Sequence, residues 1–166
     1  MGQDGRDHQR AALYAAEALV HSMFDAPTSM LQVAGTTITR PAEARFGSVQ
    51  AVTDHVARVL QRPTVREAFP RATRPVAVRT RRGHRSAHYE PGPPAVIALP
   101  ESSAGRWALR ELVVLHELAH HLAEPGTPAH GGQFAATLID LVTDVMGPEA
   151  GFVFRVVFGD AGVRVG

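Results

Sequence analysis

Residues from about 106 to 123 are expected to form a helix that is apolar on nearly every side and yet contains three histidines. Ser102 and Ser103 are candidate N-caps for it. The residues around the histidines are Leu112, Val113, Leu115, Leu118, Ala119 and Leu122. A helix that is apolar all round is buried, and buried imidazoles need partners because an unsatisfied polar group destabilises the fold. The chain must therefore bring partners to these histidines.

The order of residues in His116-Glu117-Leu118-Ala119-His120 predicts what the partner is. Positions i and i+4 lie on the same face of a helix, so both imidazoles can reach one Zn²⁺ ion. Glu117 lies beside that face, where its carboxylate can touch a zinc-bound water without being a ligand. The segment therefore predicts a zinc site with Glu117 as its general base.

A catalytic zinc usually has three protein ligands and one open position, so a third ligand is needed. His130 is expected to supply it, because the Pro-Gly-Thr-Pro stretch at 125–128 can turn the chain back after the helix. Glu124 lies eight residues beyond His116, about 12 Å along a helix, which is too far for one ion to bind both. Asp140 and Asp144, on the following helix, are weaker alternatives.

Two other interpretations of the histidines remain open. They could form a core pair that is satisfied without metal, or hold a zinc ion that has no part in catalysis. Glu117 argues against the second, because a structural zinc site would use a fourth ligand instead. His121 faces away from the row of His116 and His120, so packing or exposure is expected for it.

Composition limits the kind of site further. The chain has no cysteine, which excludes disulfides, iron–sulfur clusters, thiol catalysis and cysteine-bound zinc, so any metal must bind His, Asp or Glu. Its 166 residues, 45% hydrophobic and 20% charged, predict one globular domain over 1–166. No apolar run approaches the roughly 18 residues of a membrane helix, and Asp4 and Asp7 are unlike a signal peptide. A soluble, cytoplasmic protein with no membrane partner is expected.

Hydrophobic periodicity and turn residues predict the elements. Helices are expected over 6–25, from the N-cap Ser48 to residue 60, over 106–123 and over 131–146, with a short helical turn before Pro70. Strands are expected at 76–79, 86–90 and 95–99, and a hairpin over 30–39 turning at Ala34-Gly35. Residues 148–162 favour a helix, although 152–158 also has strand composition. The fold class is therefore α+β: a small mixed or antiparallel sheet packed on the helix with His116 and His120, with further flanking helices.

The segments His116-Glu-Leu-Ala-His120 and His130-Gly-Gly-Gln-Phe134 resemble the H-E-x-x-H…H-G-x-x-F pattern of SprT-like and related minimal zincin metallopeptidases, over about residues 95–140. The stretch 107–149 is also similar to an actinobacterial family of metallohydrolases, and this similarity extends over most of the chain. The resemblance implies a zincin-like fold, Zn²⁺ bound by His116, His120 and His130, and Glu117 as base. The chain departs from these families in the shorter spacing to His130, the missing cysteine zinc ribbon, and Ala123 where metzincins have glycine.

These observations predict a zinc metallohydrolase, specifically a metalloendopeptidase that cleaves a peptide or protein substrate. In zincins the strand just before the active helix borders the cleft, so the resemblance implies that the strand at 95–99 can pair with an extended substrate backbone. Tyr89, His88 or a nearby arginine could stabilise the transition state, and the sequence does not choose between them.

A competing function comes from the basic middle of the chain. Residues 40–90 have eleven basic against four acidic side chains, and the run from Arg71 to Arg85 contains six arginines. Such a run could bind nucleic acid, although no aromatic residues alternate with the arginines to stack on bases. A solvated face is favoured. The alternative to an enzyme is therefore a zinc-stabilised binding module without turnover. Such a module could associate with DNA through residues 71–85.

Overall fold

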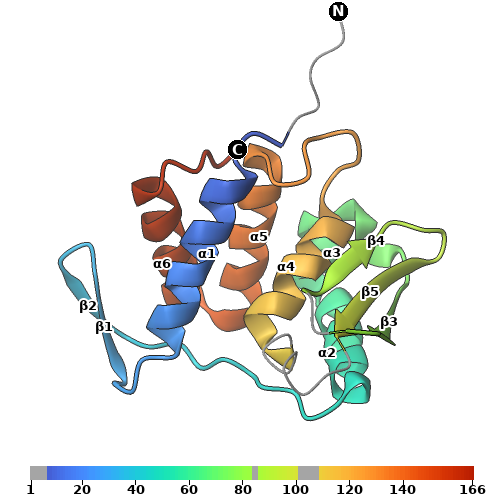
Figure 1. Cartoon of the computed structure of the whole chain (residues 1–166), viewed down its shortest axis with the longest axis horizontal. Coiled ribbons are helices and arrows are strands. Elements are labelled where there is room, and N and C mark those ends of the chain that lie inside the picture. Colours follow the sequence, from blue (N-terminus) through green and yellow to red (C-terminus); the bar gives the residue numbers. More distant parts are fainter. Residues whose placement is uncertain (1–6, 84–85, 101–108) are drawn as a thin grey trace, which may run out of the picture. The chain divides into compact units, whose positions relative to one another are not determined.

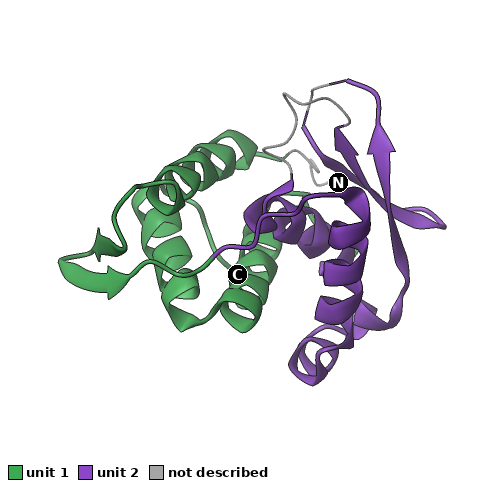
Figure 2. Ribbon diagram, turned by 90° about the horizontal axis from the view of Figure 1, so that it is seen from below, with its two compact units in different colours: residues 1–42, 124–166 green, residues 43–123 purple. Residues whose placement is uncertain are grey.

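The computed structural model describes residues 7–83, 86–100 and 109–166. It divides into two compact units, unit 1 with residues 1–42 and 124–166 and unit 2 with residues 43–123 (Figure 2). The described residues form helices and two small sheets, which confirms the α+β class (Figure 1). No helix in the described ranges has both the length and the apolar character needed to cross a membrane. Ser102, Ser103 and Arg85, named above, lie outside the described residues.

Unit 1 contains three long helices and a hairpin: α1 (Arg10–Phe24), β1 (Met30–Val33), β2 (Thr36–Thr39), α5 (Gly132–Met146) and α6 (Pro148–Asp160). The hairpin turns at Ala34 and Gly35, whose φ angles are 49° and 75°. Positive φ at both central residues is what the commonest two-residue hairpin turn requires. The predicted hairpin and its turn are therefore confirmed.

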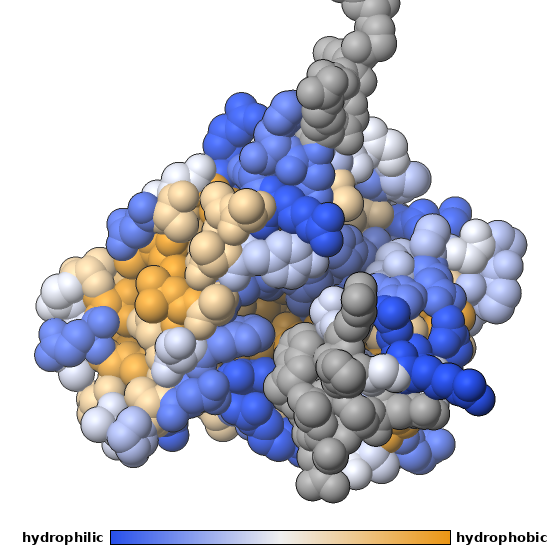
Figure 3. All heavy atoms as spheres, viewed as in Figure 1, coloured by the Kyte–Doolittle hydropathy of each residue, from blue (hydrophilic) through white to orange (hydrophobic). Residues whose placement is uncertain are grey.

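The core of unit 1 lies where α6 packs against α1 and α5. The largest fully buried side chains here include Leu13 of α1, Leu138 of α5 and Phe154 and Phe158 of α6. The buried residues of α6 recur every three or four positions, which confirms a helix rather than a strand at the end of the chain. Leu19 of α1 is exposed, and Figure 3 shows apolar side chains gathered on the α1 and α6 side of this unit.

The elements described in unit 2 are α2 (Val49–Gln61), α3 (Pro63–Ala68), η1 (Pro70–Thr73), β3 (Val76–Arg81), β4 (His88–Glu90), β5 (Ala95–Pro100) and α4 (Glu111–Leu122). Ser48 caps α2 as predicted, because its Oγ accepts a hydrogen bond of 3.1 Å from the Ala51 N–H. The strand order is β3-β5-β4, with β5 parallel to β3 and antiparallel to β4. The sheet is therefore mixed, and α4 contacts β4 and β5.

The place of β5 in this sheet corrects the expected substrate strand. β5 is the central strand, hydrogen-bonded to β3 on one edge and to β4 on the other, and all six of its residues are buried. It cannot also pair with a substrate backbone, so that prediction for 95–99 is wrong. A continuous apolar run such as Ala95–Leu99 is typical of a strand buried on both faces. The sequence of this segment therefore already favours a central strand over an edge strand. The edge strand next to α4 is β4.

The start of α4 is the second correction. The helix begins at Glu111, not near 106, because Arg110 is extended and its backbone forms a β-bridge with Arg45. Glu43 supplies the cap: its Oε2 accepts a hydrogen bond of 3.0 Å from the Leu112 N–H. The same carboxylate pairs with the buried Arg110 guanidinium at 2.7 and 3.0 Å. An acid from a distant segment therefore fixes where this helix begins.

Candidate metal centre

His116 and His120 lie one turn apart on α4, as their spacing predicts. Their Nε2 atoms are 3.3 Å apart and their ring centroids 5.0 Å apart. Two nitrogens that bind one tetrahedral Zn²⁺ at their usual bond length are about 3.3 Å from each other. The pair is therefore already spaced as two ligands of one ion.

His130 comes just before α5, and Asp7 holds it at two points. The His130 backbone N–H donates to Asp7 Oδ1 over 3.2 Å, and the ring Nδ1 lies 2.5 Å from Asp7 Oδ2. Since a carboxylate accepts hydrogen bonds, the proton is on Nδ1 and the lone pair is on Nε2. This is the usual arrangement behind a metal-binding histidine, in which a carboxylate fixes the ring and leaves the other nitrogen to the metal.

Two aromatic residues contact the His130 ring. The Tyr14 hydroxyl lies 3.2 Å from His130 Nε2, and the Phe134 ring meets the His130 ring edge-on, with centroids 5.2 Å apart. With the lone pair on Nε2, Tyr14 is the donor in this hydrogen bond. Tyr14 therefore stands at the atom of His130 that would bind a metal.

The three predicted ligands come together. One ligand atom from each of His116, His120 and His130 lies within 4.8 Å of the other two. His116 and His130 are buried, and His120 is half-buried. Three imidazoles are a donor set that suits zinc and several other divalent transition metals. The described residues thus contain a histidine group that can hold a metal ion.

The rival ligands are not members of this group. Glu124 is exposed and follows Ala123, the C-cap of α4. Asp140 is exposed on α5 with Arg155 4.0 Å away, and Asp144 on the same helix is half-buried. None of these acids is needed to explain how the histidines could bind metal.

Glu117 is buried in α4, with 6% of its surface exposed. Burying a carboxylate is unfavourable unless it has partners, so an acid placed here differs from the solvated acids of a helix surface. It directly follows His116, one of the two paired imidazoles. The role of Glu117 as general base stays a prediction.

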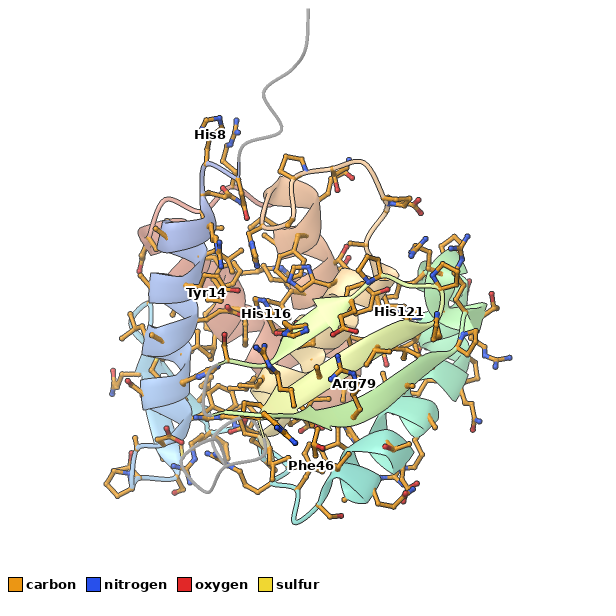
Figure 4. All side chains as sticks on the ribbon, turned by 45° about the vertical axis from the view of Figure 1, so that its right-hand side comes forward. His8, Tyr14, Phe46, Arg79, His116 and His121 are labelled. Carbon is orange, nitrogen blue, oxygen red and sulfur yellow. The ribbon has the colours of Figure 1, made fainter. Side chains whose placement is uncertain are left out.

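His121 has a different environment from its neighbour His120. It is fully buried, its Nε2 lies 2.9 Å from the Arg74 carbonyl oxygen, and its Nδ1 lies 2.9 Å from the Tyr89 hydroxyl. Burial, followed by the nearby charges of Arg71 and Arg74, lowers the pKa of the His121 imidazole. The neutral ring donates from Nε2 and accepts at Nδ1, which agrees with the expected packing role. Figure 4 shows His116 and His121 beside the strands of the sheet.

Replacing His121 by alanine is therefore expected to affect stability and not metal binding. The change leaves the Arg74 carbonyl and the Tyr89 hydroxyl without their partner, which lowers the free energy of unfolding by about 2–3 kcal/mol. Denaturant unfolding measures this loss, and elemental analysis of the purified variant should show wild-type metal content. A folded His121→Ala protein that has lost its metal would contradict this division of roles.

The candidates for transition-state stabilisation differ in their surroundings. The Tyr89 ring lies parallel to the His120 ring, with centroids 6.3 Å apart. His88 instead contacts Glu90, with Nε2 2.8 Å from Oε1, and its Nδ1 contacts Arg81. The hydrogen bond from His88, helped by the charge of Arg79, lowers the pKa of the Glu90 carboxyl. Of these candidates, Tyr89 is the one whose ring lies beside that of a predicted ligand, His120.

The arginine-rich segment is partly engaged within unit 2. Arg71 Nε donates to the His121 carbonyl oxygen over 2.9 Å, Arg79 pairs with Glu90, and Arg81 contacts the Ser86 carbonyl as well as a histidine ring. These side chains therefore have partners in the fold, as an ordinary charged face would. Nucleic-acid binding by 71–85 stays an untested alternative to the favoured solvated face.

Sequence reasoning missed Asp7 and Tyr14. A metal-binding histidine usually has a carboxylate partner, so one could be expected for His130, but no local pattern indicates an acid 123 residues away in the sequence. The resemblance to SprT-like metallopeptidases stays a resemblance of motifs. In comparisons with family models, curated proteins and solved structures, none matches this chain.

Proposed function

We propose that this protein is a zinc-dependent metalloendopeptidase in which His116, His120 and His130 hold the ion and Glu117 is the general base. The observation that carries the proposal is the histidine group itself, whose ligand atoms lie within 4.8 Å of one another. The residue that follows His116 in α4 is the buried Glu117. Three imidazole ligands leave a fourth position open, which distinguishes a catalytic zinc site from a structural one.

The chemistry assigned to each residue follows from its surroundings. A zinc ion bound here would supply Lewis acidity, lowering the pKa of water toward about 7 and polarising a carbonyl group. Glu117 takes the proton from the attacking water and passes it to the leaving amine. Asp7 Oδ2 lies 2.5 Å from the His130 Nδ1. This contact keeps the His130 ring in the tautomer whose Nε2 can bind metal.

The sheet favours an extended peptide as substrate. β4 is an edge strand, and the unpaired edge of a sheet is where an extended peptide can add as a further strand. Tyr89 is the middle residue of β4, and its ring lies beside His120 of α4. A peptide along β4 would therefore run next to the helix that holds two of the three ligands.

The proposal is tested by incubating zinc-loaded protein with unfolded casein and with a random peptide library, and identifying products by mass spectrometry. Cleavage is expected, and it should stop when a chelator removes the metal and return when zinc is added back. Folded protein that keeps its zinc and cleaves neither substrate set would count against the peptidase and support a non-catalytic zinc module.

A further inference from the structure

Unit 2 contains a pocket of about 500 Å³ that the mechanism above does not use. It is lined by the start of β3, the loop between β4 and β5, Arg71, Arg74, Tyr89 and His121. A volume of this order is within the range of small-molecule sites and can hold an amino-acid side chain with room to spare. It is therefore a candidate for a ligand site of its own.

The pocket is positively charged. Two arginines are among the described residues that line it, and no acidic residue is. Arg71 uses Nε to bind the His121 carbonyl, which positions its guanidinium at the pocket. A ligand of negative charge fits this lining.

The rest of the pocket lining is mostly apolar. It includes Pro91, Pro93 and Pro94 of the loop between β4 and β5, together with Val76 and Ala95 from the strands. Proline fixes its own φ angle, so this wall is stiff. Guanidinium groups combined with an apolar wall suit a carboxylate that is attached to an apolar stem, rather than a free inorganic anion.

Tyr89 connects the pocket to the candidate metal centre. It lines the pocket, and its ring lies parallel to that of His120, with centroids 6.3 Å apart. We infer that the pocket is a subsite that binds a carboxylate of a peptide substrate, either an acidic side chain or the C-terminal carboxylate. Its place in catalysis rests on the proposed function, whereas the binding itself does not.

The test measures binding to the zinc-loaded full chain carrying Glu117→Gln, so that the probes stay intact. Three fluorescein-labelled alanine-rich peptides differ at one point each: a central Glu with an amidated C-terminus, a central Gln with an amidated C-terminus, and a central Gln with a free carboxylate. Fluorescence anisotropy should show at least one of the two carboxylate peptides binding about tenfold tighter than the neutral one. Tighter binding of the Glu peptide identifies an acidic side chain as the ligand, and tighter binding of the peptide with a free C-terminus identifies the terminal carboxylate.

Arg74 is the residue to change, because its side chain is exposed while only its backbone carbonyl binds His121. Arg74→Gln should weaken the carboxylate peptide about fivefold or more and leave the neutral peptide unchanged. Arg82→Gln is the matched control, since it removes the same charge from an exposed residue outside the pocket lining. It should change affinity less than twofold.

Equal affinity for the three peptides would overturn the subsite, and so would equal weakening by Arg74→Gln and Arg82→Gln, which indicates bulk charge alone. Selective binding that depends on Arg74, together with a zinc-loaded wild type that cleaves neither casein nor the library, would keep the carboxylate site and reject the peptidase. Cleavage of either substrate set without selective binding of the carboxylate peptides would keep the peptidase and reject the carboxylate subsite.

Discussion

Glu117→Gln is expected to lower peptide hydrolysis by at least about 100-fold, the scale for losing a positioned general base. The change keeps the size of the side chain and removes its basic carboxylate, so zinc content and thermal stability should stay near wild type. The three imidazoles form the ligand group without Glu117, which is buried and follows His116 in α4, so its amide should leave that group intact. Initial rates, elemental analysis and a thermal melt measure the three quantities on one preparation.

Glu124→Gln is the matched control for this experiment. It makes the same chemical change on an exposed acid just beyond the end of α4, outside the histidine group, and should keep both rate and zinc. If Glu117→Gln loses zinc along with activity, the site has been damaged and the variant does not identify the base. If it keeps zinc and hydrolyses at the wild-type rate, Glu117 is not the base and the mechanism fails.

Local signals predicted most of the elements. The turn at Ala34-Gly35, the cap at Ser48 and the helical spacing of apolar residues in 148–160 each act within a few residues, so the sequence around them is enough. The start of α4 does not follow from local signals. Its cap is the carboxylate of Glu43, which lies far from the helix in sequence.

The order of strands is a tertiary property, and that is why the substrate strand was misplaced. Nothing in 95–99 itself says that β3 pairs with β5 in parallel while β4 occupies the edge. The candidate metal site likewise has one part that local sequence predicts and one part that depends on tertiary structure. The pairing of His116 with His120 follows from helix geometry, whereas the partners of His130 come from Asp7 and Tyr14 near the other end of the chain.

The histidine group is expected to bind one zinc ion per chain, with each ligand contributing strongly. Replacing His116, His120 or His130 singly by alanine should lower zinc affinity by more than about 100-fold, because losing a ligand exceeds the 10- to 100-fold usual for losing a residue behind one. Competition with a chromogenic chelator measures the affinity. It should also weaken below about pH 6, since the imidazoles bind metal only in their neutral form.

Asp7→Asn tests the environment of His130 without removing a ligand. The asparagine can still accept one hydrogen bond, but it no longer carries the charge that holds the proton on Nδ1, 2.5 Å away. Zinc affinity should therefore fall about 10- to 100-fold, less than for His130→Ala. Asp140→Asn, on an exposed acid outside the group, should leave affinity unchanged. If His130→Ala keeps full zinc while Glu124→Ala loses it, the third ligand is Glu124, and the contact between Asp7 and His130 is structural only.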